Sequence, residues 1–224
     1  MTAALLFDLD GTLIDSDTAH LRAFQRVFAA HGIALDKETY NKRILGADNL
    51  AIGRDFLPHL SEAERAAVLA AKEERYREDL GEVEPIAGVN ALLDFAAARG
   101  LGCALVTNAP RANVKAVLAA LGLAKRLTLW VLGPEVARPK PDPLPYRTAL
   151  AKLGAEAGRS LAFEDSLSGL RAARGAGLAV VGLTTTLTAD KLIAAGAEIA
   201  IADFTDPRIL PLIEAHIAAP GKKA

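Results

Sequence analysis

The sequence predicts an α/β protein in which a parallel sheet, covered by helices on both faces, is interrupted by an all-helical insert. Short apolar runs of strand length alternate with amphipathic helical patterns over most of the chain. Residues 15–84 break that alternation, because they carry helical patterns and no convincing strand. Strands that alternate with helices indicate a parallel sheet whose two faces are both covered.

The first strand is expected at residues 3–7, an apolar run that ends directly before Asp8. Further strands are expected at 102–106, 128–132, 160–163, 178–183 and 198–202. Helices with one apolar face are expected at 88–99, 110–121, 143–153, 166–176, 188–195 and 206–218.

The insert begins where Ser16 can cap a helix that carries apolar residues at helical spacing. A second helix is expected after Ser61, because Ser61 and Glu64 form a capping-box pattern. The predicted domains are a core of residues 1–14 and 85–224 and a helical cap of residues 15–84.

Composition excludes several classes of protein. The chain has 224 residues, of which 51% are apolar, and a formal net charge of -1, so no strong field attracts nucleic acid or an anionic membrane. No stretch approaches the roughly 18 apolar residues of a membrane span, and the N-terminus lacks the features of a signal peptide. We therefore expect a cytoplasmic protein without nucleic-acid or membrane partners, whose oligomeric state the sequence does not indicate.

The one cysteine, Cys103, is expected to be a small core residue.

The strongest chemical signal is Asp8-Leu9-Asp10-Gly11-Thr12. It follows the first strand, at the end where open parallel sheets bind ligands. The two-residue period of a strand would put Asp8 and Asp10 on one side, and Gly11 permits a sharp turn. The alternative interpretation is that two acids and a glycine simply end a strand.

Polar groups also follow three other predicted strands: Thr107-Asn108, Lys140 and Glu164-Asp165. Taken singly, each has an ordinary explanation as a turn residue, a solvated loop charge or a helix cap. Together they converge on one edge of one sheet. Clustered acids repel one another unless a cation neutralises them, and oxygen ligands suit a hard divalent ion, so we expect Mg²⁺ there.

This set of groups suits phosphoryl transfer, which depends mostly on positioning and electrostatics. Asp8 would attack phosphorus in line and form an acyl phosphate, while Lys140 and Thr107 bind the phosphate oxygens. Asp10 would protonate the leaving alcohol and then deprotonate the water that hydrolyses the intermediate.

The four motifs, in this order, resemble those of the haloacid dehalogenase-like superfamily of phosphatases. The spacing and the helical insert are similar to the branch that holds phosphoglycolate phosphatase and beta-phosphoglucomutase. The resemblance covers nearly the whole chain and implies a Rossmann-like core with a cap that closes over the substrate. It also implies that the metal ligands are Asp8, the main-chain carbonyl of Asp10 and Asp165, with Glu164 as a further ligand or a neighbour of the ligands.

The same resemblance identifies candidate substrate-binding residues in the cap. His20 and Lys72 lie at or near positions where beta-phosphoglucomutase has a histidine and a lysine. Leu45 and Asn49 stand where the mutase's specificity loop has a lysine and an arginine, so this chain departs from the mutase pattern. Several stretches resemble broad-range sugar-phosphate phosphatases instead. The candidates for binding substrate are Asn108, His20, Asn49, Lys72 and Arg111, with Arg43 and Arg54 as further arginines.

The leading hypothesis is a phosphatase that hydrolyses a small phosphorylated metabolite, such as a sugar phosphate or phosphoglycolate. Asp10 favours a phosphate ester with an alcohol leaving group. The alternatives are a phosphomutase of the beta-phosphoglucomutase type and a non-catalytic binding protein on the same scaffold. For His20 and the arginines, a solvated or ion-paired surface role is the alternative.

Overall fold

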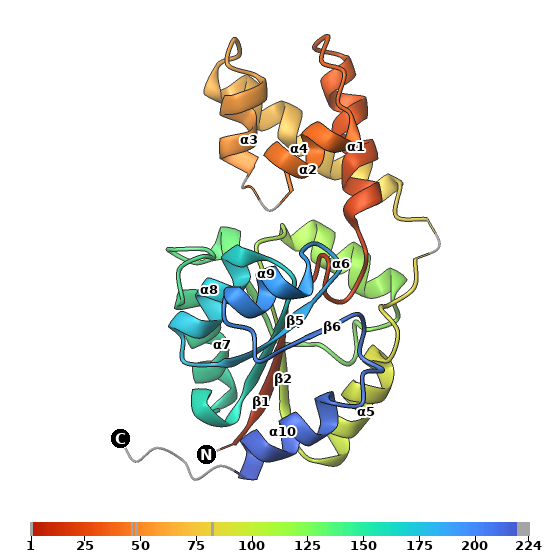
Figure 1. The fold of residues 1–224 in the computed structure, drawn as a ribbon. Coiled ribbons are helices and arrows are strands. Elements are labelled where there is room, and N and C mark those ends of the chain that lie inside the picture. The colour runs from red at the N-terminus through yellow and green to blue at the C-terminus, as the bar shows by residue number, and fades with distance from the viewer. Residues whose placement is uncertain (1, 46, 48, 82, 219–224) are drawn as a thin grey trace. The chain divides into compact units, whose positions relative to one another are not determined.

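The core is a parallel sheet of six strands in the order β3-β2-β1-β4-β5-β6. The computed structural model describes residues 2–45, 47, 49–81 and 83–218 (Figure 1). The strands are β1 (Ala4–Phe7), β2 (Gly102–Thr107), β3 (Trp130–Leu132), β4 (Leu161–Glu164), β5 (Ala179–Leu183) and β6 (Ile199–Ile201). The strand order reverses direction around β1, so the carboxyl ends of β1, β2 and β4 lie side by side.

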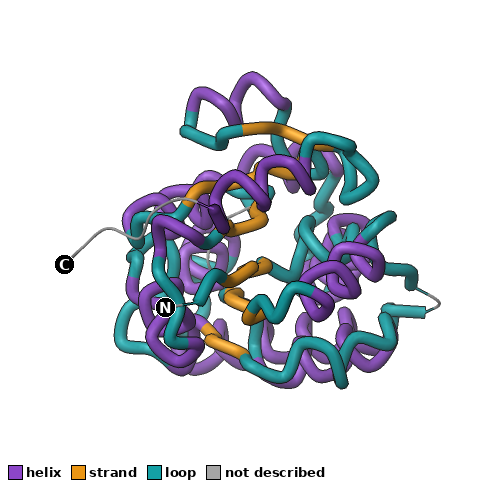
Figure 2. The backbone as a smooth tube through the Cα atoms, turned by 90° about the horizontal axis from the view of Figure 1, so that it is seen from below, coloured by secondary structure: helices purple, strands orange, loops and turns teal. Residues whose placement is uncertain are grey.

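Helices lie on both sides of this sheet (Figure 2). They are α5 (Val89–Ala98), α6 (Arg111–Ala120), α7 (Leu144–Leu153), α8 (Leu167–Gly175), α9 (Ala189–Ala194) and α10 (Ile209–Ala218). Two short 3₁₀ turns, η1 (Gly133–Glu135) and η2 (Ala157–Arg159), complete the core. The predicted α/β fold with a covered parallel sheet is confirmed.

Alternate residues of each strand pack on opposite faces of the sheet, as the strand period requires. On one face, Leu6 and Val106 share an apolar cluster with Leu150 of α7 and Leu170 of α8. On the other face, the rings of Phe7 and Phe163 stack with their centroids 4.9 Å apart. Both faces of β1 are therefore buried, which explains why this strand is an unbroken apolar run.

The helical insert consists of α1 (Asp17–Ala29), α2 (Lys37–Arg43), α3 (Asn49–Phe56) and α4 (Glu62–Glu78) among the described residues. It has its own apolar core, in which Phe24 and Phe28 of α1 pack with Phe56 of α3. The chain divides into two compact units, the core unit of residues 1–15 with 84–224 and the helical insert of residues 16–83. These divisions differ by one residue from the predicted boundaries.

The three predicted helix caps differ in outcome. The capping box of α4 is confirmed, because the Ser61 hydroxyl accepts from the Glu64 N–H and the Glu64 carboxylate accepts from the Ser61 N–H. The prediction for Ser16 is wrong, since its side chain makes no capping hydrogen bond to α1. The alternative role of Asp165 as a cap is also wrong, because the Ser166 hydroxyl caps α8 by accepting from the Gly169 N–H at 3.0 Å.

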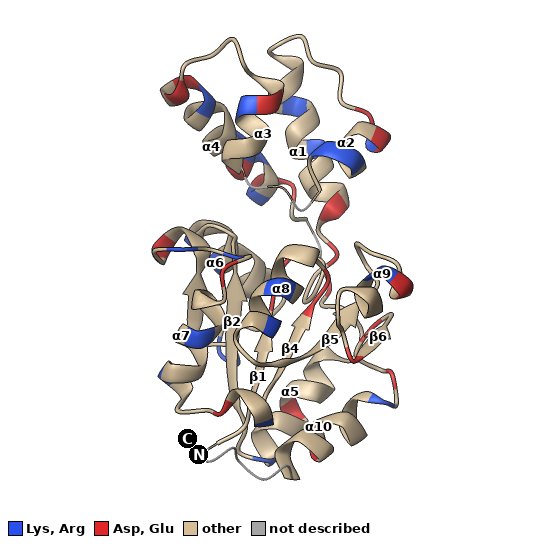
Figure 3. Ribbon diagram, turned by 60° about the vertical axis from the view of Figure 1, so that its left-hand side comes forward, with Lys and Arg blue, Asp and Glu red and all other residues tan. Residues whose placement is uncertain are grey.

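The distribution of charge, the character of the helices and the burial of Cys103 can be compared with what the composition predicts. Acidic and basic residues are mixed over both units (Figure 3). Within the described part of the chain, no helix has the length and apolar character to cross a membrane. Cys103 lies partly buried in β2, and burial raises the pKa of its thiol to about 11, so the reactive thiolate is scarce at neutral pH.

Candidate active site

Asp8 is the first residue after β1, and the adjoining turn depends on a glycine. The Asp8 N–H donates to the Phe163 carbonyl at 3.1 Å, which continues the pairing of β1 with β4. Gly11 then turns the chain with a φ of 72°, a backbone conformation that disfavours residues with a Cβ atom. A Cβ atom on Gly11 would also overlap the carboxylate of Asp165. The motif therefore needs glycine for both its turn and its close approach to Asp165.

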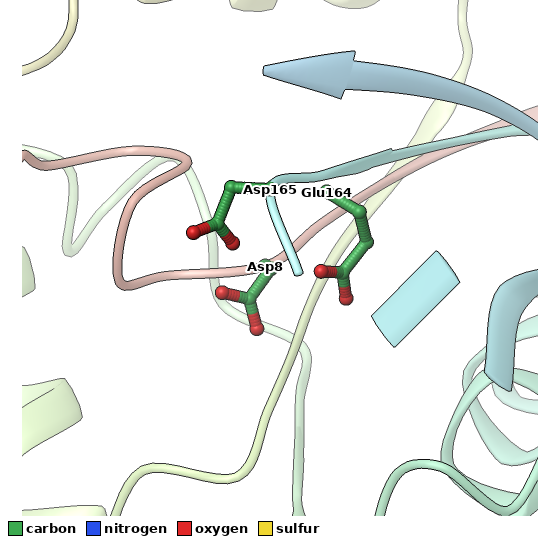
Figure 4. A group of neighbouring side chains, drawn as sticks. All are labelled: Asp8, Glu164 and Asp165. Carbon is green, nitrogen blue, oxygen red and sulfur yellow. The ribbon is translucent and has the colours of Figure 1, made fainter. Parts of the chain in front are cut away.

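Three buried carboxylates converge beside this turn. Asp8, Glu164 and Asp165 each place a carboxylate oxygen within 4.8 Å of the others, and their residues are 8%, 0% and 5% exposed (Figure 4). They come from the ends of β1 and β4, neighbouring parallel strands. Asp10 follows two residues after Asp8, is partly buried, and pairs with Ile14 in an isolated bridge.

Lys140 supplies the positive charge of the cluster. Its ammonium nitrogen lies 2.6 Å from Asp8 Oδ1 and 2.5 Å from Glu164 Oε1, and the residue is only 6% exposed. Burial opposes the charged form, but Asp8 and Glu164 raise the pKa of Lys140, so the lysine stays protonated. Lys140 is thus held as a buried cation against the two acids.

When ionised, the three acids carry more negative charge than the single positive charge of Lys140 neutralises. Burial raises the pKa of Asp8 to about 7; Lys140 opposes the rise, and repulsion from Glu164 adds to it. Burial, with repulsion from Asp8 and Glu164, raises the pKa of Asp165 well above its usual value. Such crowding of carboxylate oxygens fits a bound divalent metal ion, whose charge would relieve both the burial penalty and the repulsion.

Thr107 and Asn108 end β2, the strand next to β1. The Thr107 hydroxyl oxygen is buried and accepts from the Ala109 N–H at 3.1 Å. The Asn108 side chain donates to the Lys140 carbonyl at 3.1 Å and accepts from the Lys140 N–H at 3.2 Å. Asn108 was predicted to bind substrate, and in the structure its side chain fixes the main chain of Lys140.

Sequence reasoning missed several residues that support these groups. The Tyr146 hydroxyl donates to Glu164 Oε1 at 2.6 Å, from a position predicted only as part of a helix. The Thr186 hydroxyl donates to Asp165, and the Thr185 hydroxyl donates to the Gly11 carbonyl at 2.5 Å. Both threonines follow β5 at the same sheet edge, so the logic of polar residues after strands could have found them. No comparable signal distinguishes Tyr146.

Three of the predicted substrate-binding residues meet inside the helical insert. The Lys72 ammonium lies 2.9 Å from His20 Nδ1 and 3.0 Å from Glu73 Oε1, and the Asn49 amide donates to the same Glu73 oxygen at 2.9 Å. The His20 ring stacks on Tyr76 with centroids 3.9 Å apart. Glu73, which the sequence did not single out, joins Lys72 to Asn49. We call His20, Asn49, Lys72 and Glu73 the insert cluster.

The arginines proposed for substrate binding lie on the surface, and two are ion-paired. Arg111 makes a two-pronged contact with Glu135, at 2.6 and 2.5 Å. Arg43 makes a similar contact with Asp55 and lies over the Phe56 ring. Arg54 is exposed at the end of α3. The alternative of ion-paired surface arginines therefore describes Arg43 and Arg111 as they stand.

Comparison with known proteins decides the family. A family model described as haloacid dehalogenase-like hydrolase matches residues 5–183. The chain belongs to the haloacid dehalogenase-like hydrolases. The match includes all four polar strand ends, from Asp8 to Asp165, and the whole helical insert.

Relatives of this hydrolase include named phosphatases. Validoxylamine A 7'-phosphate phosphatase of Streptomyces hygroscopicus subsp. limoneus is 33% identical, over 93% of this chain and 97% of the relative. Phosphoglycolate phosphatase of Rhodospirillum rubrum is 34% identical, over 91% and 88%. A crystal structure of a CbbY variant from Rhodobacter sphaeroides with xylulose-1,5-bisphosphate has a TM-score of 0.82 and 32% identity, covering 92% of this chain and 96% of CbbY.

These likenesses confirm the predicted family, its phosphoglycolate phosphatase branch and the enzyme class, a hydrolase of phosphoric monoesters. The hydrolase is similar to the three relatives over nearly their full lengths. The roles of the individual side chains, the identity of the metal and the substrate of this chain stay predictions.

Proposed function

We propose that this haloacid dehalogenase-like hydrolase removes phosphate from a small phosphate monoester through an aspartyl phosphate on Asp8, with magnesium as its metal ion. The observation that carries the proposal is the placing of the Asp8 carboxylate. It lies at the carboxyl end of β1, 2.6 Å from the Lys140 ammonium and within 4.8 Å of oxygens from Glu164 and Asp165. A carboxylate kept beside both a cation and an acidic metal-binding cluster is suited to attack a phosphorylated substrate.

Asp8 attacks the phosphorus atom in line with the bond to the leaving oxygen. Lys140 neutralises charge on a phosphoryl oxygen, and the Thr107 hydroxyl donates a hydrogen bond to another. Because these groups are buried, their electrostatic effect on the transition state is larger than it would be in water. Asn108 keeps Lys140 in place through its main chain.

The metal ion would be held by Asp8, the main-chain carbonyl of Asp10 and Asp165, with Glu164 as a further ligand or a neighbour. When bound, magnesium would reduce the repulsion between the attacking carboxylate and the anionic phosphate. Thr186 orients the Asp165 carboxylate through its hydrogen bond.

Asp10 acts as the general acid and base. It protonates the oxygen of the leaving alcohol when the phosphoryl group moves to Asp8. It then takes a proton from the water molecule that attacks the aspartyl phosphate, and the products are an alcohol and inorganic phosphate.

The first test is phosphate release from a panel of sugar phosphates, phosphoglycolate and nucleotides, with magnesium and with EDTA. We expect release that requires magnesium and favours a few sugar phosphates or phosphoglycolate. Asp8→Asn should reduce turnover at least about 1,000-fold while the protein stays folded. Asp94→Asn is the matched control, since Asp94 is an exposed acid paired with Arg126 on the same unit. Substantial turnover by Asp8→Asn would contradict the assigned nucleophile.

We also propose that the insert cluster recognises the leaving group, because it gathers a cation, an imidazole and an amide. Lys72→Met keeps the length of the side chain and removes its charge. We expect kcat/KM for the preferred substrate to fall about tenfold, and less for the other substrates, since a lost charged hydrogen bond is worth roughly 1.5–3 kcal/mol. Lys42→Met is the control, because Lys42 is an exposed lysine of the same unit. Equal losses for every substrate would argue against a role in recognition. Arg111 stays a candidate for binding substrate from the core unit.

No observation favours either alternative, the phosphomutase or the non-catalytic binding protein. A phosphomutase would isomerise a sugar phosphate with a bisphosphate activator and release no phosphate, so the same panel separates it. A non-catalytic binding protein would release phosphate from nothing on the panel.

A further inference from the structure

We propose that Tyr146 is a positioning residue for Lys140 and acts through Glu164. Its hydroxyl fixes the Glu164 carboxylate, and that carboxylate holds the lysine ammonium against Asp8. The inference rests on the proposed function, in which Lys140 binds a phosphoryl oxygen.

The three side chains form a buried chain of hydrogen bonds. Tyr146 lies in the first turn of α7 and is fully buried. Its hydroxyl lies 2.6 Å from Glu164 Oε1, the same oxygen that accepts from the Lys140 ammonium at 2.5 Å. A phenol at neutral pH carries its proton and donates it. Tyr146 and Lys140 therefore both donate a hydrogen bond to the same oxygen of Glu164.

Lysine needs such support, because its flexible stem loses rotamer entropy when the ammonium is held in one place. The Tyr146 ring lies under the ammonium, with the nitrogen 5.1 Å from the ring centroid. Tyr146 thus contacts the cation with its ring and fixes the anion with its hydroxyl. These two contributions can be separated by experiment, since phenylalanine retains only the first.

The other contacts of Glu164 agree with a role in holding Lys140. Its second oxygen, Oε2, accepts from the Ser166 hydroxyl at 3.3 Å. Gly169 leaves the space that the carboxylate occupies, because a Cβ atom there would overlap it. Glu164 is therefore fixed from α7, from α8 and from the Lys140 loop. The geometry assigns this acid first to the lysine, whatever it adds to the metal site.

The test is Tyr146→Phe. With magnesium and the preferred substrate, we expect kcat to fall about tenfold and KM to change less than twofold, because a positioned lysine matters most as charge moves in the transition state. Orthovanadate mimics that transition state, so its affinity should weaken by a similar factor. The affinity for inorganic phosphate should change less than twofold.

Three further variants test whether Tyr146 acts through Glu164. Ser160→Ala removes another fully buried hydroxyl, at the opposite end of β4, where it accepts from the Ala4 N–H. It should lower the melting temperature but leave kcat and vanadate affinity unchanged. Glu164→Gln should be slower than Tyr146→Phe, and the double variant should be no slower than Glu164→Gln alone, because coupled residues are not additive.

The outcomes separate the two proposals. Unchanged kcat and vanadate affinity in folded Tyr146→Phe would overturn the positioning role. Additive losses in the double variant would overturn the route through Glu164. If the wild-type protein releases no phosphate, the proposed function fails, and calorimetric vanadate binding by wild type and Tyr146→Phe still decides the inference: equal affinity, or none in either, overturns it.

Discussion

At the scale of single residues, the active site is built at a cost to stability. Asp8 and Asp165 are buried beside Glu164, and Lys140 contacts Asp8 and Glu164. Burial and repulsion raise the pKa of both aspartates, which means that folding disfavours their ionised forms. Active sites commonly sacrifice stability in this way, because the groups needed for chemistry are held together against their repulsion.

Asp8→Asn should therefore stabilise the metal-free protein, and more so at higher pH. The pKa of Asp8 is about 7 in the folded protein, against 3.8 as the reference value. The folded state binds the proton more tightly, so ionisation of Asp8 weakens folding progressively from about pH 4 to pH 7. The penalty is absent below this window and complete above it. Asparagine avoids it, and we expect a gain of roughly 2 kcal/mol at pH 8, reduced because Lys140 loses a partner.

Urea unfolding in EDTA at pH 5.5 and pH 8 measures this difference. The gain should be larger at pH 8, and Asp94→Asn should show no gain that grows with pH. An Asp8→Asn protein that is less stable than wild type at pH 8 would mean that the contact with Lys140 outweighs the burial of the charge.

The residues that carry charge could be predicted from the sequence, but their supports could not. Asp8, Lys140, Glu164 and Asp165 stand after apolar strands, and the parallel sheet gathers them at one edge. Tyr146 lies on the apolar face of a helix, where a tyrosine looks like any core aromatic residue. Only the spatial meeting of α7 with β4 reveals its hydroxyl as a partner of Glu164.

At the scale of secondary-structure elements, loops are fastened to one another by side chains. Asn108, after β2, binds both main-chain polar groups of Lys140, in the loop that precedes α7. Thr185, after β5, binds the Gly11 carbonyl in the turn after β1. These bonds fix segments distant in sequence, so the geometry of the proposed active site depends on the loops as well as on the strands.

The first turn of α8 also shapes the site, through Gly169. A Cβ atom there would overlap the Glu164 carboxylate. Although alanine is the better helix former, we expect Gly169→Ala to lower stability by roughly 1–3 kcal/mol and kcat at least tenfold, because overpacking displaces Glu164. Gly158→Ala in η2 is the control, since its Cβ atom would meet open space. Thermal unfolding and phosphate-release kinetics measure both effects. Unchanged kcat in Gly169→Ala would show that Glu164 tolerates displacement.

Periodicity predicted the core elements well, because each is amphipathic or buried on both faces. Helix α5 was predicted at 88–99 and spans Val89–Ala98, and α8 was predicted at 166–176 and spans Leu167–Gly175. The predicted strand at 128–132 forms only at Trp130–Leu132. Capping was predicted less well, because Ser16 has the right residue type but lacks the extended backbone that most capping residues adopt.

At the scale of the whole molecule, the helical insert departs from the core unit and returns to it at neighbouring points. The Leu13 carbonyl accepts from the Ile86 N–H at 2.9 Å, although 73 positions separate them in the sequence. The insert has its own apolar cluster, and the sheet has its own as well. Each unit therefore has an apolar core of its own, as separate domains have.

Replacing residues 16–83 with a short Gly/Ser linker should leave a core unit that folds and melts cooperatively. If the insert recognises the leaving group, the shortened protein should bind inorganic phosphate about as well as wild type and lose its preference among substrates. Circular dichroism, thermal unfolding and the ratio of kcat/KM between two substrates measure these properties. A shortened protein that folds and still discriminates would place recognition in the core unit, where Arg111 and Asn108 lie.

The family could be predicted from the order of the four motifs along the whole chain, since each places a particular type of polar side chain after a strand. The leaving group could not be predicted, because the groups that we propose for its recognition meet only when the insert folds. His20 and Lys72 are far apart in sequence, and Glu73 joins Lys72 to Asn49 through a contact that no local pattern indicates.

The chemistry of Cys103 makes the protein convenient for site-specific labelling. Its thiol is the only one in the chain, and because burial raises its pKa to about 11, we expect it to react slowly with maleimides at neutral pH. A cysteine introduced at an exposed position in each unit would therefore take up fluorescent dyes without first removing the native thiol. Energy transfer between the two dyes would then report how the distance between the core unit and the helical insert responds when phosphate or vanadate binds.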